Sequence, residues 1–233
     1  MLCGNDLIYV QLYGEFMTKK ITIYTDYVCP YCLLAEHVIE GVTEGKDVEI
    51  HWRPYELRPD PVPTLRVGDP YLPHIWKHSV YPLAERLGVP IKLPAISPQP
   101  RTGSAFEVFA MAEEQGLGHA FSMRALRAFF QEEMDIGNPE ILADLGASVG
   151  LKREAVLDAL AKGTYREQHQ EALRHAREDM EITSVPTIVV GTQVFRGVPQ
   201  SEEFRRAIDR IESDVDQGGQ PYNEVSGCNT SIQ

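Results

Sequence analysis

Near the start of the chain, the pattern of hydrophobic and polar positions predicts a strand, a helix and a second strand. Residues Ile21 to Thr25 are mostly β-branched or aromatic, which is typical of a buried strand. From Pro30 onward a period near 3.6 predicts a helix, with apolar positions at Leu33, Leu34, Val38 and Ile39. Residues Val48 to Arg53 alternate again until prolines end the pattern. This order is typical of two parallel strands joined by a crossover helix.

The long middle segment has the periodicity of helices. Prolines punctuate residues 58–100, where one helix is predicted from Tyr71 to Leu87 and an extended connector follows it. Two apolar helix faces come next, formed by Phe106, Phe109 and Ala110 and by Phe121, Ala125, Ala128 and Phe129. We therefore expect a block made of helices alone.

Local signals predict where the later helices begin and end. Asn138 is expected to be an N-cap, and Gly150 is expected to stop the helix that follows it. A further helix should stop at Gly163. Thr164 and Glu167 have the spacing of a capping box, which predicts a third start.

Strand character returns late in the chain. The segment VPTIVVGTQVF is predicted to form a hairpin, and Ser201 is the expected N-cap of a closing helix. That helix has one apolar face, made of Phe204, Ala207, Ile208 and Ile211. We therefore expect an α/β fold in which residues 18–57 and 179–214 form one sheet domain. Residues 58–178 would be a helical insertion, and residues 1–17 and 215–233 would be tails.

Composition limits the classes of function. Of the 233 residues, 43% are hydrophobic, which fits a globular protein, and the net charge of −12 without a Lys/Arg cluster argues against nucleic-acid binding. No apolar run approaches the length that spans a membrane, and the first residues make a poor signal peptide. The sequence thus predicts a cytoplasmic protein with no membrane partner. Translation could start at Met1 or at Met17.

The chain has four cysteines, at positions 3, 29, 32 and 228, which is too few for a disulfide scaffold of this length. Where thiols are kept reduced, a closely spaced pair is more often catalytic or metal-binding than structural. Cys228 could be an auxiliary redox thiol, although an inert thiol on a tail is the favoured interpretation. Cys3 is given no role.

Cys29 and Cys32 lie in the tetrapeptide CPYC, where the first strand pattern changes into the first helix pattern. Only a thiolate attacks a disulfide, and the free N–H groups and positive dipole end of a helix N-terminus favour the anion. Cys29 is expected at the N-cap or first position of the helix, with Pro30 directly after it. This geometry predicts an exposed nucleophile at Cys29 and a shielded resolving thiol at Cys32.

Zinc binding is the alternative for this pair, because two cysteines at this spacing often hold zinc. A structural zinc site normally needs four ligands, and the sequence has no second pair of this kind. His74 and His78 lie four apart on a predicted helix and could be two ligands, but a packed or solvent-facing histidine pair is favoured. We expect no metal site.

Pro186 directly precedes the first strand of the predicted hairpin, which suits a strand start or a sheet edge. A sharper hypothesis is a cis Val185–Pro186 bond that faces the cysteines. The Val185 backbone could then pair with an extended substrate peptide.

Taken together, the strand, CPYC and helix near the start, SVPT before a late hairpin, and the closing helix resemble the thioredoxin superfamily. The long helical segment between Cys32 and Pro186 resembles its DsbA-like branch, and the phrases DYVCPYC and WRPYELRPD resemble the cytoplasmic FrnE-like group. The resemblance implies a thioredoxin fold with a large all-helical insertion, an exchange-active pair and a cis proline at Pro186. It also implies that Pro30 and Tyr31 tune the redox potential.

Asp26, three residues before Cys29, has two possible roles. It could be a buried acid that moves protons during exchange, or a side chain that caps the helix, and we favour capping.

Three functions follow from these observations. The first is a dithiol–disulfide oxidoreductase or isomerase acting on protein thiols and disulfides, with no tightly bound cofactor beyond a Cys29–Cys32 disulfide and with glutathione or thioredoxin as electron donor. The second is a glutathione-dependent enzyme of the 2-hydroxychromene-2-carboxylate isomerase or kappa-class transferase type, for which Cys32 is unnecessary. The third is a metal-binding or redox-sensing protein. We expect the first.

Overall fold

The computed structural model describes residues 19–216, so Cys3, Met17 and Cys228 lie outside the described residues. A four-stranded sheet has the order β2-β1-β3-β4, formed by β1 (Lys19–Thr25), β2 (Val48–Pro54), β3 (Thr187–Val190) and β4 (Gln193–Arg196). The β1 strand pairs parallel to β2 and antiparallel to β3, and β3 pairs antiparallel to β4. The expected strand, helix, strand unit and the late hairpin are therefore both present.

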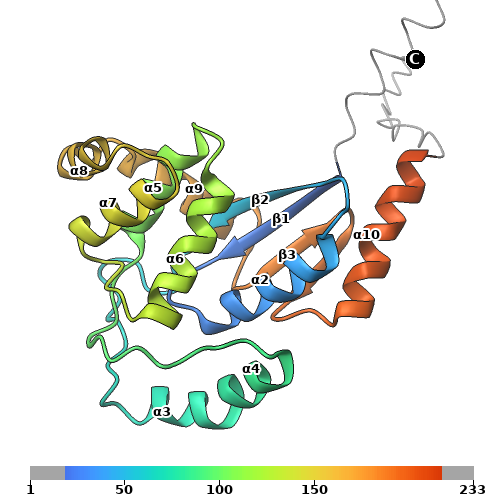
Figure 1. Cartoon of the computed structure of the whole chain (residues 1–233), viewed down its shortest axis with the longest axis horizontal. Coiled ribbons are helices and arrows are strands. Elements are labelled where there is room, and N and C mark those ends of the chain that lie inside the picture. Colours follow the sequence, from blue (N-terminus) through green and yellow to red (C-terminus); the bar gives the residue numbers. More distant parts are fainter. Residues whose placement is uncertain (1–18, 217–233) are drawn as a thin grey trace, which may run out of the picture.

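Two helices lie side by side along one face of this sheet (Figure 1): α2 (Pro30–Thr43) and α10 (Ser201–Asp216). Apolar side chains of α2 and β1 are buried between helix and sheet, among them Leu33, Leu34, Ile21 and Ile23. Each such side chain stabilises the fold by about 1.5–3 kcal/mol through its removal from water. Segments at opposite ends of the chain therefore share one core.

The other helices come between β2 and β3 in the chain. They are α3 (Tyr71–Ile75), η1 (Trp76–Val80), α4 (Tyr81–Leu87), α5 (Gly103–Glu113), α6 (Gly118–Glu132), α7 (Pro139–Ser148), α8 (Arg153–Lys162), α9 (Arg166–Arg174) and η2 (His175–Asp179). The two predicted phenylalanine-rich faces are buried, with Phe109 at 3% exposure, Phe106 at 1%, and Phe121 and Phe129 at 0%. In Figure 1 the arm formed by α3 and α4 lies apart from the group that contains α5 to α9.

The predicted helix from Tyr71 to Leu87 is present, but it contains a π-helical segment from Trp76 to Val80. Pro82 explains this difference, because proline has no N–H to donate to the carbonyl four residues earlier and its ring crowds that carbonyl. The helix ends as expected before Gly88, whose φ of 69° is in the left-handed region.

Two predicted helix starts are wrong. Gly163 has φ 63°, and the Thr164 amide donates to the Ala159 carbonyl at 3.0 Å, so Thr164 completes the end of α8 and does not cap α9. The α9 helix begins at Arg166 instead. Ser201 is the first residue of α10, because the Phe204 amide donates to the Gln200 carbonyl at 2.9 Å.

Asn138 is the N-cap of α7 as predicted, and its side chain accepts from the Glu140 amide at 2.9 Å. No helix among residues 19–216 is long and apolar enough to cross a membrane.

Candidate active site

Cys29 is the N-cap residue of α2, with the extended backbone angles φ −93° and ψ 112° that let the chain turn from β1 into the helix. Its amide donates to the Asp26 carbonyl at 3.0 Å, and its own carbonyl accepts from the Cys32 amide at 3.0 Å. Pro30 occupies the first turn of α2, where its missing N–H leaves no intrahelical bond unmade. The predicted position of Cys29 is confirmed.

The Val185–Pro186 peptide bond is cis and lies opposite Cys29. The Cys29 thiol donates to the Val185 carbonyl at 3.5 Å. Pro186 leads directly into β3, and its carbonyl accepts from the Gly197 amide at 2.8 Å. Two segments that are far apart in the sequence thus meet at one sulfur.

Both cysteines are free thiols in this structure, and both are buried. Cys29 is 5% exposed and Cys32 is 2% exposed, so the expectation of an exposed nucleophile is wrong. The physical reason is the loop at Val185, which lies against the Cys29 sulfur. Burial raises the pKa of the Cys32 thiol well above its ordinary value, and the Cys29 sulfur raises it further, while the Thr25 hydroxyl and the Asp26 amide act in the opposite direction.

Asp26 is buried, at 1% exposure, and no side chain in the described chain caps α2. The Leu57 amide donates to its Oδ2 at 2.7 Å, and the Thr102 hydroxyl donates to its Oδ1 at 2.8 Å. The favoured capping role is therefore wrong. Burial raises the pKa of Asp26 to about 6, although these two hydrogen bonds oppose the rise. This value gives the site a carboxyl group that can hold or release a proton near neutral pH.

Tyr31, between the two cysteines, connects the active-site turn to the helical arm. Its hydroxyl lies 2.6 Å from the Ser79 hydroxyl on η1. Tyr31 also lines a groove of ≈ 610 Å³ whose other walls come from α4 and from the loop between β4 and α10. The groove is mainly apolar, with one cation, and its lining includes Leu83, Arg86, Leu87, Val198 and Pro199.

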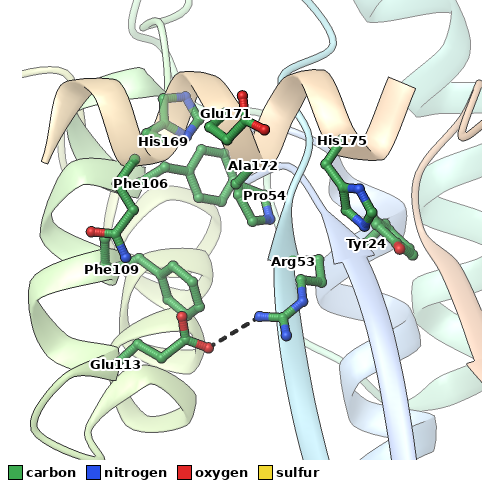
Figure 2. A pocket seen from close by; sticks show the side chains of 12 residues that line it. Tyr24, Arg53, Pro54, Phe106, Phe109, Glu113, His169, Glu171, Ala172 and His175 are labelled. Atoms are coloured by element: carbon green, nitrogen blue, oxygen red, sulfur yellow. Dashed lines mark hydrogen bonds and ion pairs between the residues drawn. The ribbon is translucent and has the colours of Figure 1, made fainter. Parts of the chain in front are cut away.

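A second cavity, of ≈ 380 Å³, lies beside the ends of β1 and β2 and is lined partly by α5 and α9. Figure 2 shows aromatic side chains along this cavity and an ion pair between Arg53 and Glu113. Arg53 Nη1 lies 3.3 Å from Glu113 Oε1. His169 projects into this region from α9.

The rings of His74 and His78 lie with centroids 4.3 Å apart and planes tilted by 36°, and His78 Nδ1 lies 2.8 Å from the His74 carbonyl oxygen. Within residues 19–216 no group of three or more His, Cys, Asp or Glu side chains has a geometry that could hold a metal ion.

Comparison with known proteins places this arrangement in a family. The DSBA-like thioredoxin domain family matches residues 20–209. The chain belongs to this family. Its fold, with four strands and a helical insertion after β2, is that of a DsbA-like thioredoxin fold, as the sequence predicts.

Three known proteins are similar to this DSBA-like protein. YwbO of Bacillus subtilis (strain 168) is 44% identical over 193 residues, which cover 82% of this chain and 96% of YwbO. A crystal structure described as a probable DsbA oxidoreductase, SCO1869 from Streptomyces coelicolor, has a TM-score of 0.70 at 20% identity and covers 89% of this chain and 94% of its own. A 2-hydroxychromene-2-carboxylate isomerase has a TM-score of 0.69 at 16% identity, with 86% and 100% covered. At these identities the two structures show a shared fold.

Sequence reasoning missed the residues that hold Asp26. Leu57 lies within the phrase WRPYELRPD, which carried the family resemblance without suggesting a role. Thr102 is 76 positions from Asp26, and no local pattern could connect the two.

Proposed function

We propose that this DSBA-like protein is a thiol–disulfide oxidoreductase or isomerase that exchanges disulfides with protein substrates through Cys29 and Cys32. The observation that carries the proposal is the Cys29 sulfur at the N-terminus of a 14-residue helix, 3.5 Å from the Val185 carbonyl beside cis-Pro186. A helix N-terminus supplies free N–H groups and the positive end of the helix dipole, and the proline loop supplies backbone groups for an extended chain.

In the first step the Cys29 thiolate attacks one sulfur of a substrate disulfide. A bond forms between Cys29 and that sulfur, and the other substrate sulfur leaves as a thiolate that takes a proton from solvent. The product is a mixed disulfide between enzyme and substrate.

In the second step Cys32 attacks the Cys29 sulfur and releases the second substrate thiolate. Because the pKa of Cys32 is raised, its thiol is protonated at neutral pH. Only a thiolate attacks a disulfide, so Cys32 must lose this proton before the second step. Asp26 is the base assigned to this proton, because its amide faces the Cys32 sulfur and burial raises its carboxyl pKa to about 6. Two electrons pass to the substrate, leaving a Cys29–Cys32 disulfide, and the reverse sequence oxidises a dithiol substrate.

Substrate contact is assigned to the groove beside Tyr31, since it borders the CPYC turn and has apolar walls from Leu83 and Leu87. Pro30 and Tyr31 would set the redox potential through their influence on the turn that holds the sulfurs. A cytoplasmic enzyme of this kind would be returned to its dithiol state by glutathione or thioredoxin, with no tightly bound cofactor.

A glutathione-dependent isomerase is the second candidate, and the fold similarity to 2-hydroxychromene-2-carboxylate isomerase supports it. Such an enzyme would activate the thiol of glutathione at the α2 N-terminus and would not need Cys32.

The test is turnover of insulin disulfides and reactivation of scrambled ribonuclease, with the parent chain and three variants. Cys29→Ser should lose activity, Cys32→Ser should accumulate a mixed disulfide with the substrate, and His78→Gln should act like the parent. Full activity of Cys29→Ser would refute the proposal. Isomerisation of a small aromatic substrate that requires glutathione and is unchanged in Cys32→Ala would favour the second candidate.

A further inference from the structure

Glu56, two residues after the end of β2, contacts two segments late in the chain. Its carboxylate Oε1 lies 2.8 Å from His169 Nε2 on α9, and its backbone carbonyl accepts from Arg177 Nη2 on η2 at 2.7 Å. The amide of the next residue, Leu57, donates to Asp26 Oδ2 at 2.7 Å. Helices that lie late in the chain are therefore linked to the Asp26 carboxyl group through Glu56 and the peptide bond that joins it to Leu57.

The carbonyl of Glu56 and the N–H of Leu57 belong to a single peptide group. A guanidinium on the carbonyl oxygen draws electron density away from the nitrogen, which makes the N–H a stronger donor to a carboxylate. Arg177 therefore favours the ionised form of Asp26, although no direct contact joins the two side chains.

The Glu56 carboxylate acts in the opposite direction, because its negative charge raises the pKa of Asp26. This carboxylate is held tightly. A Cβ added to Gly103, the first residue of α5, would lie 3.3 Å from Glu56 Oε1, so the start of α5 lies directly against it.

His169 fixes the other side of the Glu56 carboxylate. It is 5% exposed, and its ring stacks on Phe106 with centroids 5.3 Å apart and planes at 16° (Figure 2). Phe106 in turn stacks on Tyr27, the residue after Asp26, at 4.4 Å. His169 Nδ1 is buried without a hydrogen-bond partner among the described residues, so Glu56 is the polar contact that holds the ring.

Further groups surround Asp26. Arg58 and Arg101 line a small cavity beside it, and Cys32 lies next to its amide. The titratable or charged groups to consider are Tyr27, Cys29 and Cys32 at the start of α2, Glu56 and Arg58 after β2, Arg101 before α5, and His169 and Arg177 through Glu56.

We propose that Glu56 and Arg177 are positioning residues that set, from opposite directions, how readily Asp26 takes a proton from Cys32. The proposal rests on the proposed function, in which Asp26 is the base for the resolving thiol. It adds that the insertion, through η2 and α9, tunes a group that belongs to the thioredoxin core.

The experiment measures the pH midpoint of Asp26 in the full-length reduced protein by its ¹³C-carboxyl NMR signal, assigned by its absence from Asp26→Asn. Glu56→Gln keeps an acceptor for His169 and removes the charge, so the midpoint should fall by at least about 0.5 pH unit. Arg177→Gln removes the guanidinium from the peptide carbonyl, so the midpoint should rise. Glu171→Gln and Arg174→Gln, which alter an exposed ion pair on α9, are the matched controls and should leave the midpoint unchanged.

Midpoints that move in opposite directions support the proposal, and any other pattern in folded variants overturns it. If Arg177→Gln does not fold, Arg177→Lys replaces it and should raise the midpoint by a smaller amount. The measurement needs no disulfide substrate. A protein that shows the opposite shifts but exchanges no disulfides would therefore count against the proposed function and not against this coupling.

Discussion

At the scale of single residues, the Asp26 carboxyl group is enclosed by the Leu57 amide and the Thr102 hydroxyl, and its own amide faces Cys32. The Leu57 amide and the Thr102 hydroxyl each fix one oxygen of the Asp26 carboxyl group. Burial raises its pKa to about 6, so at neutral pH most molecules hold it ionised and able to accept a proton.

Asp26→Asn should therefore slow the second step of exchange and leave the first step almost unchanged. A positioned base contributes about 10²-fold or more to a proton transfer, so we expect the mixed disulfide to resolve more slowly by about 10²-fold or more near neutral pH. The deficit should shrink as pH rises and hydroxide removes the Cys32 proton. Single-turnover release of the second substrate thiol measures this rate, and an unchanged rate across pH would contradict the assignment.

The sequence identifies the residues that act locally. Cys29, Pro30 and Cys32 follow from a strand that changes into a helix, and Pro186 follows from its place before a strand. The setting of Asp26 could not be predicted, because its partners Leu57 and Thr102 are brought to it by tertiary packing alone. Its spacing from Cys29 therefore suggested a cap that the fold does not make.

At the scale of elements, glycine positions show where two helices pack closely and where a helix faces solvent. A Cβ added to Gly146 on α7 would lie 3.1 Å from Val156 Cγ2 on α8 and 3.3 Å from Leu151 Cδ1. A Cβ added to Gly41 on α2 would have nothing within 4 Å.

Gly146→Val should therefore destabilise the protein by about 1–3 kcal/mol, because its branched side chain overpacks the contact between α7 and α8. Gly41→Ala is the matched control and should stabilise α2 by about 0.5–1 kcal/mol, since alanine restricts the unfolded chain and meets no neighbour. Urea unfolding monitored by circular dichroism gives both values. Equal effects at the two positions would contradict this description of the packing.

The start of α7 was predictable because one side chain decides it, and the start of α9 was not because two helices compete for one residue. Asn138 caps α7 as its side chain suggests. Thr164 has an equally good capping pattern with Glu167, but the chain uses it to finish α8 after Gly163. Sequence spacing cannot show which of two adjacent helices takes a shared residue.

At the scale of the whole molecule, two buried carboxyl groups make the stability of the fold depend on pH. Burial raises the pKa of Asp26 to about 6 and that of Glu36, on α2, to about 8. In the unfolded chain such groups titrate near ~4. The folded state therefore binds more protons than the unfolded state between about pH 4 and pH 8, and stability is lost as pH rises through that window.

The free energy of unfolding should thus fall between about pH 5 and pH 8.5, with Asp26 alone contributing on the order of 3 kcal/mol. Glu36→Gln should flatten the profile above about pH 6, where Glu36 alone contributes, and should reduce the slope below it, whereas Asp26→Asn should reduce the slope only below about pH 6. Glu171→Gln changes an exposed carboxylate and should keep the parent slope. Chemical unfolding at a series of pH values measures the profile, and a parent whose stability rises across this range would contradict the burial of both groups.

The order of the elements along the chain was predictable. The contacts between the helical insertion and the active-site segment were not. Tyr31 reaches Ser79 across 48 positions, and the Tyr27 hydroxyl lies 3.0 Å from that of Ser122 across 95 positions. Both tyrosines are in the active-site segment, and both serines are unremarkable in the sequence. Hydrophobic periodicity identifies a buried face but does not identify which distant face covers it.

In the proposed mechanism the Val185 carbonyl accepts a hydrogen bond from a substrate chain, and in the free protein the Cys29 thiol donates to this same oxygen. A sulfur that has lost its proton has no hydrogen to donate, and neither has a sulfur bonded to a second sulfur. Ionisation or capture of Cys29 therefore frees that oxygen at the moment when an incoming chain could use it. Loss of one proton from Cys29 would then both make its sulfur a nucleophile and leave the Val185 oxygen free to bind the substrate chain.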